Sequence, residues 1–432
     1  MKNFLYIAVL VMLPNLAFAQ ASDSDLTELV HTVWVGICCA LIFIMQPGFA
    51  LLEGGLVRAK NTINVVMKNF ADVSVGALFF WAIGFGLIFG ENATGFIGTS
   101  GFFGQDVGAE PLDVIFQMLF AATAATIVSG SLAERVSFVP YLIGAVFITT
   151  IIYPVFASWV WGGDGDQLGW LRGLGFHDAA GGTAVHAIGG WCALAGAIVL
   201  GPRLGRFGKK DGQVRDVPGH NLPMFATGAF FLWVGWFGFN GGAAKSDLSD
   251  LGLILLNTHL SAASACFSAI VVMKLRGMPI IMTRFINGGL GGLVAITAAC
   301  NVVAPQFAIV IGLTSGAIVV FGDTFLHRFR IDDVVGAVPV HAFCGVWGTL
   351  AVGLFTTGDL LNIDLLVAQM IGVISSFVWG FGAAYLVFKT LDLTLGIRAS
   401  TFHEQRGLDY TEHNELGYAE FMKVEMHQGN RE

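Results

Sequence analysis

The chain has 432 residues, of which 55% are hydrophobic and only 12% are charged, and its formal net charge at pH 7 is -8. An ordinary soluble domain carries about 25% charged residues, so this composition argues against a soluble protein and favours a membrane protein. The charged residues are not gathered on one surface, so nucleic-acid binding is not indicated. Apolar runs recur from residue 28 to residue 391 without a large hydrophilic block, which predicts a single membrane domain.

The first residues have the pattern of a secretory signal peptide. Lys2 precedes an apolar stretch over 4–16, and Ala17 and Ala19 form an A-x-A pattern just before Gln20. The alternative, a further membrane helix, would need roughly 20 apolar residues, and this stretch is shorter. We therefore predict a signal peptide over 1–19 and a mature N-terminus outside the cell.

Long apolar runs predict an all-α membrane protein with about eleven transmembrane helices, because a helix needs roughly 20 apolar residues to cross a bilayer. The predicted spans cover residues 28–53, 64–90, 113–133, 138–160, 179–201, 222–242, 250–273, 279–302, 306–326, 334–356 and 362–391.

The basic residues determine the predicted orientation. With the N-terminus outside, most Lys and Arg residues fall in cytoplasmic loops, whereas the short external loops hold only Arg172 and Lys245. This asymmetry follows the positive-inside rule. We therefore predict a membrane domain over 20–391, with its N-terminus outside, and a cytoplasmic C-terminal tail over 392–432.

A sequence repeat relates two distant helices. Residues 178–190 read D-A-A-G-G-T-A-V-H-A-I-G-G, and residues 333–345 read D-V-V-G-A-V-P-V-H-A-F-C-G. Because an odd number of predicted spans lies between the two copies, their helices run in opposite directions. We therefore predict an inverted repeat of helices 1–5 and 6–10, an architecture in which transporters place substrate sites near the bilayer midplane.

Each copy of the repeat contains one histidine. His186 and His341 both lie eight residues after an aspartate, or about 12 Å along a helix that rises 1.5 Å per residue. Two helices that start from opposite faces of a core about 30 Å thick would bring these histidines together near its middle. Intramembrane ionisable groups usually face a pathway or one another. A helix–helix hydrogen bond, a bis-histidine haem and a metal site are the alternatives.

The aspartates that begin the two copies allow two interpretations. A carboxylate in the first turn of a helix accepts hydrogen bonds from free backbone N–H groups, and this capping role is preferred for Asp333. For Asp178, which would face the outside, attraction of a cation at the entrance is an equal alternative.

Aromatic residues gather along the predicted outer half of the pore. They form either an interfacial belt or a cation–π site for a positively charged substrate that leads to an apolar plug. These residues are Phe116, Phe120, Trp161, Trp233, Trp236, Phe237 and Phe239.

These segments resemble the ammonium transporter (Amt/Mep/Rh) family. Residues 178–203, from D-A-A-G-G-T-A-V-H to G-P-R, and V-H-A-F-C-G over 340–345 are similar to the family signatures around two pore histidines. The resemblance covers essentially the whole mature chain. Further similar segments are G-F-A-L-L-E-G-G-L-V-R-A-K-N (48–61), S-L-A-E-R (131–135), W-V-W-G-G (159–163), H-N-L-P (220–223) and G-W-F-G-F-N (235–240).

The resemblance implies roles for individual residues. Trp161 would help to form an external ammonium site, and Phe120 and Phe239 would stack beneath it as a gate. His186 and His341 would form a twin-histidine pair in an apolar pore. The family also implies a homotrimer with one pore per subunit and a cytoplasmic platform for trimeric P-II signal proteins.

The chain matches one further family position and departs from the pattern at three. Asp178 matches the family's essential aspartate near the entrance, but Ala179 follows it where an aromatic residue is usual. Ala243 stands where the external site often has a serine, which removes a hydroxyl acceptor. In the tail, Asn414 and Gly417 replace Gly and Ala, which weakens the inference that the tail couples subunits.

We therefore predict a transporter of the bacterial inner membrane rather than an enzyme, with no cofactor. It would select ammonium outside, deprotonate it and conduct ammonia through a hydrophobic pore, while the proton follows a histidine and water relay. The alternative of a different class is an ammonium sensor with little transport that signals to a cytoplasmic partner. A bis-histidine haem protein is the third hypothesis.

Overall fold

The computed structural model describes residues 23–105, 111–165, 167–208, 213–244 and 248–419. Within these residues the chain is all-helical, and its only β pairings are isolated bridges. The signal peptide predicted over residues 1–19 lies outside the described residues.

Ten helical segments of the described chain are long and apolar enough to cross a membrane. Helix is the expected form, because a backbone inside lipid must satisfy its hydrogen bonds within the segment. The segments are α2 (Asp23–Leu56); α3 (Thr62–Phe79) with η2 (Phe80–Gly84) and α4 (Phe85–Phe89); α5 (Pro111–Leu132); α6 (Phe138–Phe147) with η4 (Ile148–Ile152) and α7 (Tyr153–Trp161); η5 (Gly182–Ala187) with α9 (Ile188–Leu200); α10 (Leu222–Gly241) with η6 (Gly242–Ala244); η7 (Leu248–Asp250) with α11 (Leu251–Leu275); α13 (Pro305–Arg328); η8 (Val338–Phe343) with α14 (Cys344–Phe355); and α15 (Ile363–Ser376) with η9 (Phe377–Phe381) and α16 (Gly382–Thr394).

The span predicted over residues 279–302 forms a shorter helix, α12 (Met282–Thr297). Its 16 residues fall below the roughly 20 that a full crossing needs. The helix ends in a turn at Ala298, whose carbonyl accepts a hydrogen bond from the backbone N–H of Ala179 at 3.1 Å. The C-terminal end of α12 therefore contacts the loop that begins the first repeat copy.

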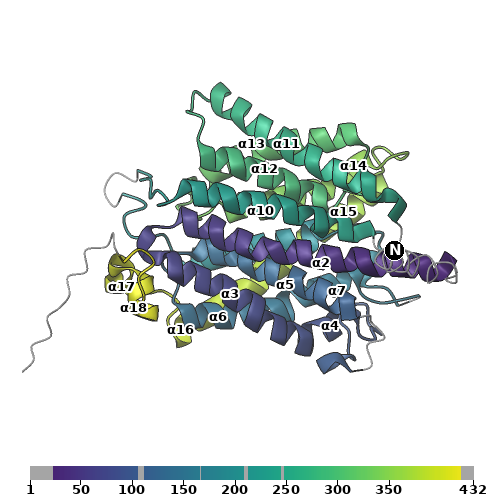
Figure 1. Cartoon of the computed structure of the whole chain (residues 1–432), viewed down its shortest axis with the longest axis horizontal. Coiled ribbons are helices and arrows are strands. Elements are labelled where there is room, and N and C mark those ends of the chain that lie inside the picture. The colour runs from purple at the N-terminus through teal and green to yellow at the C-terminus, as the bar shows by residue number, and fades with distance from the viewer. Residues whose placement is uncertain (1–22, 106–110, 166, 209–212, 245–247, 420–432) are drawn as a thin grey trace, which may run out of the picture.

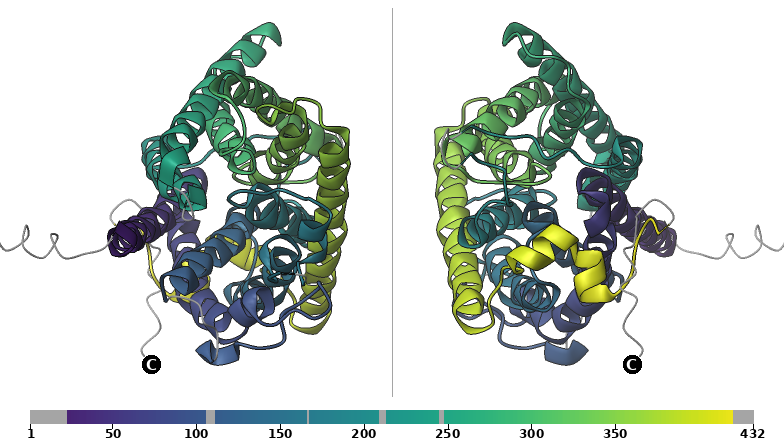
Figure 2. Two further views of the ribbon diagram at one scale, coloured as in Figure 1. Left: turned by 90° about the vertical axis from the view of Figure 1, so that its right-hand side faces the viewer. Right: turned by 90° about the vertical axis from the view of Figure 1, so that its left-hand side faces the viewer.

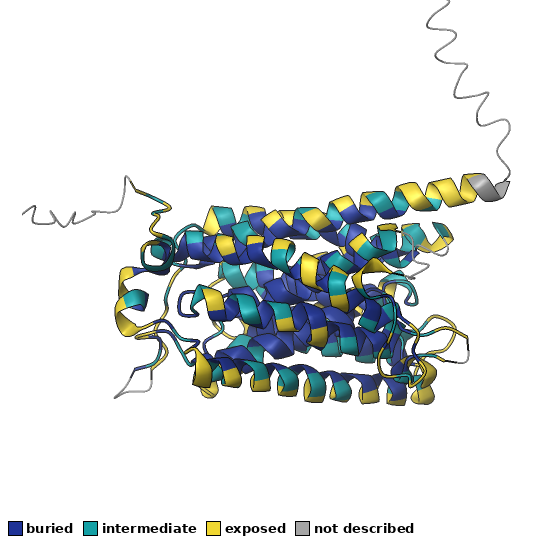
Figure 3. Ribbon diagram, turned by 90° about the horizontal axis from the view of Figure 1, so that it is seen from below, coloured by how far each residue is buried: buried dark blue, intermediate teal, exposed yellow. Residues whose placement is uncertain are grey.

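The helices run side by side along the long axis of the molecule (Figure 1). The start of α2 lies at one end of this bundle, and α17 (Thr401–Arg406) and α18 (Leu408–His413) lie at the other. Burial follows the expected pattern for a membrane bundle, with inner faces buried and outer faces exposed (Figure 3). Large apolar side chains cover the outside, including Phe70, Leu78, Phe230, Phe267, Phe321 and Leu386.

The C-terminal segment folds back across the end of the bundle that lies opposite the start of α2. Figure 2 shows α17 and α18 across this end. The backbone N–H of Leu408 donates to Asn61 Oδ1 at 2.9 Å, and that of Asn64 donates to Asp409 Oδ1 at 2.9 Å. The segment is thus bonded to the short turn before α3 and to the first turn of α3 itself.

Candidate functional site

The two repeat histidines lie in two π-helical turns, His186 in η5 and His341 in η8. Such wide turns occur frequently at functional sites. In η5 the backbone N–H of His186 donates to Gly181 O at 3.0 Å, the five-residue spacing of a π-turn. Gly181 has a φ of +98°, and a Cβ there would lie 2.6 Å from Val185, so the start of η5 requires glycine.

A carboxylate caps each of these turns. Asp178 accepts four backbone hydrogen bonds: Oδ1 from Gly181 at 2.9 Å and Gly182 at 2.7 Å, and Oδ2 from Thr183 at 2.8 Å and Ala184 at 2.9 Å. This is the geometry of a helix cap. The side chain is buried, so a cation that approached Asp178 would share oxygens already bonded to the backbone.

The cap of the second turn makes fewer hydrogen bonds to the backbone. Asp333 accepts one bond on each oxygen, from Gly336 N at 3.2 Å and from Val338 N at 2.7 Å. Pro339, which has no N–H to offer, occupies the second position of η8. The two copies thus share a cap but differ in the number of donors that it satisfies.

The structure brings the two histidines into contact. His186 Nδ1 and His341 Nδ1 lie 3.3 Å apart, and the ring centroids are separated by 5.3 Å at an interplanar angle of 23°. Both side chains are buried. A haem held between them would have to separate the rings, so this contact does not support the bis-histidine haem hypothesis.

A row of aromatic rings extends from His186 to Trp161. Phe239 lies 5.1 Å from the ring of His186, and it stacks on Phe120 at 4.1 Å with an angle of 14°. Phe120 in turn lies 6.1 Å from Trp161. These contacts form a continuous row in the order Trp161, Phe120 with Phe239, His186 and His341.

The remaining aromatic candidates divide into two groups. Phe116 packs against Phe120 at 4.6 Å, and Trp236 stacks on His186 at 4.9 Å and donates from Nε1 to Thr297 Oγ1 at 2.9 Å. Trp233 and Phe237 instead lie near His259 of α11. Half of the aromatic cluster of α10 therefore faces the row of rings, and the other half faces a neighbouring helix.

Ala243 lies in the short turn η6 that follows α10 and is half-buried. The residue before it, Gly242, packs closely on the Phe116 ring, because a Cβ at Gly242 would lie 2.3 Å from two ring carbons. This turn therefore lies beside the aromatic row, at its Phe116 side.

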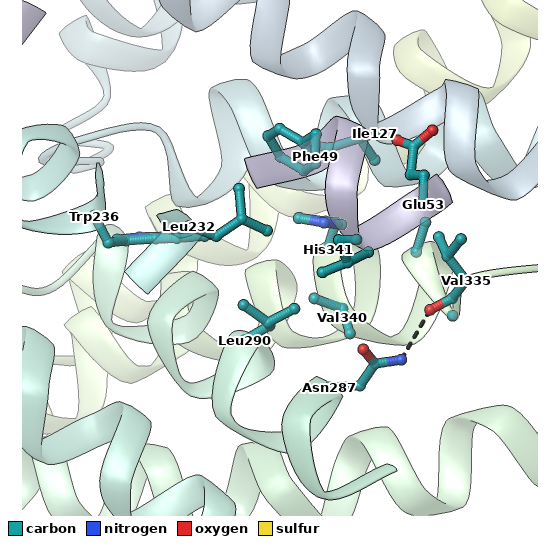
Figure 4. Close-up of a pocket in the computed structure, with 13 residues that line it drawn as sticks. Phe49, Glu53, Ile127, Leu232, Trp236, Asn287, Leu290, Val335, Val340 and His341 are labelled. Atoms are coloured by element: carbon teal, nitrogen blue, oxygen red, sulfur yellow. Dashed lines mark hydrogen bonds between the residues drawn. The ribbon is translucent and has the colours of Figure 1, made fainter. Parts of the chain in front are cut away.

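His341 and Trp236 both line a narrow cavity (Figure 4). The volume of this cavity that the centre of a water molecule can occupy is about 20 Å³. Its lining is mostly apolar, with polar groups from His341, Trp236, Asn287 and Glu53. The side chain of Asn287 is held by a hydrogen bond from Nδ2 to Val335 O at 2.8 Å.

A second cavity of about 420 Å³ shares Asn287, Val335 and Gly336 with the first. In contrast to the narrow cavity, it is rich in charge. Its charged and titratable lining residues are Arg203, Arg206, Asp216, Arg284, Asp323, His327 and Asp333. We call it the inner vestibule.

A buried ion pair supports the wall of the inner vestibule. Arg203 donates to Asp332 from Nε at 2.9 Å and from Nη2 at 3.0 Å, and Arg135 Nη2 donates to the backbone carbonyl of Asp332 at 2.6 Å. Burial alone would raise the pKa of the Asp332 carboxyl, but the hydrogen bonds and charge of Arg203 hold that pKa well below its usual range.

Sequence reasoning assigned no role to Glu53, Asn287 or the Arg203–Asp332 pair. Glu53 lies inside the segment G-F-A-L-L-E-G-G, and an acid in an apolar span is by default a candidate functional residue. The sequence alone therefore marks Glu53 as a candidate functional residue. The pair between Arg203 and Asp332 joins two loops 129 positions apart, and no local pattern indicates it.

The row of rings, the paired histidines and the cavity occur in a chain that matches the Ammonium Transporter Family over residues 33–418. The chain belongs to the ammonium transporter family. It is therefore a multi-pass membrane protein of a transporter family rather than an enzyme, and ammonium or ammonia is the family's substrate.

Relatives and solved structures agree with this assignment. Ammonium transporter Amt2 of Archaeoglobus fulgidus is 41% identical, over 97% of this chain and 96% of the relative. The structure of a sensor Amt protein superposes with a TM-score of 0.87 at 40% identity, over 90% of this chain and 99% of that protein. Mep2 from Candida albicans superposes with a TM-score of 0.78 at 28% identity, over 86% and 87% of the two chains.

Proposed function

We propose that this ammonium transporter binds ammonium beside Trp161, Phe120 and Ala243, removes its proton at the Phe120–Phe239 gate, and conducts ammonia past His186 and His341. The observation that carries the proposal is the unbroken row of contacts from Trp161 to His341. Asp178 acts at the entrance by holding the turn that carries His186.

The apolar lining favours ammonia over an intact ion. Insertion scales put a charged side chain at the bilayer centre at about 2.5–3.5 kcal/mol, and simulations give more. Phe120 and Phe239 are stacked closely and are buried, so the gate offers an ion no replacement for its hydration shell. Loss of a proton before the gate removes this penalty for the nitrogen.

The proton needs a separate route, and the histidine pair supplies one. Neutral imidazole has one donor and one acceptor nitrogen, so two facing rings can pass a proton along. His186 Nε2 is buried without a protein partner among the described residues. That nitrogen is therefore available to ammonia, ammonium or water in the pore.

The second candidate function is an ammonium sensor with little flux. The similarity to a solved sensor Amt protein and the absence of a serine hydroxyl at Ala243 favour it. Its readout would be a cytoplasmic partner such as a P-II protein bound near α17 and α18. In this second case ammonium would bind at the same outer site but would not cross.

Flux measurements on purified protein in liposomes distinguish the two functions. A transporter gives ammonium-dependent current and no potassium current, whereas a sensor retains ammonium binding with flux near that of empty liposomes. A matched variant, Phe237→Leu, changes an aromatic residue of α10 that faces α11 and should leave flux unchanged.

We also propose a location and an assembly. The chain would lie in a bacterial inner membrane as a homotrimer, with a membrane domain over 20–391 and a cytoplasmic tail over 392–432. The exposed apolar side chains of the outer helices suit lipid and neighbouring subunits. A reporter fused to the C-terminus should be active only in the cytoplasm, and periplasmic activity would contradict the orientation.

A further inference from the structure

Three charged side chains are buried in the membrane spans next to the pore, and the mechanism above uses none of them. They are Glu53 of α2 and Lys68 and Asp72 of α3, and none is more than 1% exposed. Ionisable residues at such depth are costly and usually belong to a substrate or proton pathway.

Neighbouring polar residues link Glu53 and Lys68. Glu53 Oε2 accepts from Ser129 Oγ at 2.8 Å and from Asn69 Nδ2 at 3.1 Å. Lys68 Nζ donates to the carbonyl of the same Ser129 at 3.4 Å. Glu53 and Lys68 therefore meet at one residue of α5.

The far side of the cluster reaches α6. Lys68 Nζ lies 5.2 Å from the centre of the Tyr141 ring, and the Tyr141 hydroxyl donates to Asp72 Oδ2 at 2.7 Å. Asp72 Oδ1 is buried without a hydrogen-bond partner among the described residues. Glu412 of α18 and Arg135 are the other charged groups within electrostatic range of Lys68.

The charges of the three groups balance when the cluster binds one proton. Two ionised carboxylates and one ammonium would leave a net negative charge in a buried site, which is unfavourable. One bound proton, shared between the two acids, would make the three groups neutral as a set. The cluster can therefore bind and release a proton without creating an isolated charge of more than one unit.

Only Glu53 of the three connects this cluster to the pore. Glu53 and His341 line the same narrow cavity, on its α2 and η8 walls (Figure 4). Its volume of about 20 Å³ exceeds the roughly 10–15 Å³ that one water requires. Such a water would have polar neighbours in His341, Glu53 and Asn287, which meets the requirement of two to four partners.

We propose that Glu53 is the proton acceptor that follows His341. A proton that leaves ammonium passes through His186 to His341, and His341 gives an N–H proton to the cavity water while that water gives one to the Glu53 carboxylate. The neutral ammonia moves on through the cavity, and Glu53 then releases the proton to water of the inner vestibule. Lys68 is a positioning residue that keeps the empty carboxylate ionised. This inference rests on the proposed transport function.

The test is Glu53→Gln in liposomes, with current and internal pH recorded after ammonium is added outside. In the unchanged protein, ammonia and proton enter together, so a current flows and the interior pH stays nearly constant. In Glu53→Gln, we expect a loss of current of at least about tenfold, while ammonia still enters and the interior becomes alkaline. Unchanged current in this variant overturns the inference.

A second variant separates a relay from a structural role. Glu53→Gln with Lys68→Met removes one negative and one positive charge, so the buried site keeps its charge balance. If Glu53 only balances Lys68, this double variant recovers the current, and that recovery overturns the inference. We expect the current to remain lost and the alkaline shift to persist. Loss of both signals in both variants overturns the inference too, because it means that the carboxylate shapes the ammonia path.

In the same liposome assay, a failure of the transport proposal itself would give a different result. If the unchanged protein shows neither current nor alkaline shift above empty liposomes, the transport proposal fails, and Glu53 then has no proton to accept. If the unchanged protein conducts and Glu53→Gln conducts equally, only the inference about Glu53 fails.

Discussion

Trp161 donates a hydrogen bond from its indole Nε1 to the backbone carbonyl of Asp178 at 2.9 Å. Asp178 in turn caps the turn that contains His186. The indole proposed to meet ammonium is therefore fixed to the same local structure as the first pore histidine. If ammonium binds at Trp161 as proposed, a shift of the indole would therefore also act on the turn that carries His186.

We expect Trp161→Ala to weaken transport chiefly at low external ammonium. A desolvated cation–π contact contributes about 2 kcal/mol, so the apparent affinity should fall about 30-fold. Trp161→Phe keeps a ring but loses the bond to Asp178, and a smaller fall of about fivefold is expected. The dependence of flux on ammonium concentration measures both. An unchanged affinity in Trp161→Ala would assign Trp161 to an interfacial belt.

Ala243→Ser should have the opposite effect. The serine hydroxyl would restore an acceptor beside the aromatic row, and a net hydrogen bond contributes about 1 kcal/mol, or about fivefold in apparent affinity. The same flux titration checks it, with Ala243→Val as a control that adds volume without an acceptor. A looser or unaltered affinity in Ala243→Ser would show that another group already fills this role.

Replacing both pore histidines with leucine should abolish ammonium-driven current. The proton and the intact ion would then each face an apolar barrier without assistance. Smaller polar residues at both positions should instead admit water and let potassium leak. Current and pH recorded in liposomes distinguish these cases. Full ammonium current in a correctly assembled double leucine variant would leave the histidines as structural residues.

Much of this architecture could be predicted from the sequence because its signals are local. Ten of the predicted spans correspond to segments of the described chain that are long and apolar enough to cross. The contact between His186 and His341 follows from their matched spacing from two aspartates. Both signals depend only on helical rise and bilayer thickness.

The features that could not be predicted depend on contacts between distant segments. α12 ends at Thr297, and the carbonyl of the next residue, Ala298, accepts a hydrogen bond from Ala179, a partner that lies far away in the sequence. The two π-turns leave no pattern of their own in the sequence. The separation of Trp236 from Trp233 depends on the rotation of α10, which its almost uniformly apolar sequence does not fix.

The two caps should differ in their effect on stability. Asp178→Asn leaves one acceptor oxygen and places an NH2 group against backbone N–H donors, so two of the four buried donors lose their partner at about 1–3 kcal/mol each. Asp333→Asn also keeps one acceptor oxygen, so only one of its two backbone donors loses its partner, and the melting temperature should fall less. Melting of the detergent-solubilised protein tests this order. Equal losses would mean that the backbone bonds of Asp178 contribute little.

Asp332→Asn should destabilise the protein by about 3 kcal/mol, because it removes the nearer of the two carboxylates that pair with the buried Arg203 and leaves only Glu134, at 3.7 Å. The folded-state pKa of Asp332 is lowered, so the stabilisation is present above the unfolded pKa of about 3.9 and is lost as pH falls through the folded value. The difference in melting temperature between the two proteins should therefore be constant from about pH 5 to 8 and shrink only below about pH 4. A difference that shrinks near neutral pH would assign the effect to another group.

The contact between the two Nδ1 atoms also bears on how fast protons could pass along the histidine pair. A single hydrogen atom fits between His186 Nδ1 and His341 Nδ1 at 3.3 Å, so one neutral ring must donate there while the other accepts. In the proposed relay, a proton that travels inward would reverse these two tautomers. Under that proposal, the pair would have to return to its first arrangement before the next proton could follow, so the rate of this return would set an upper limit on the protons carried per second.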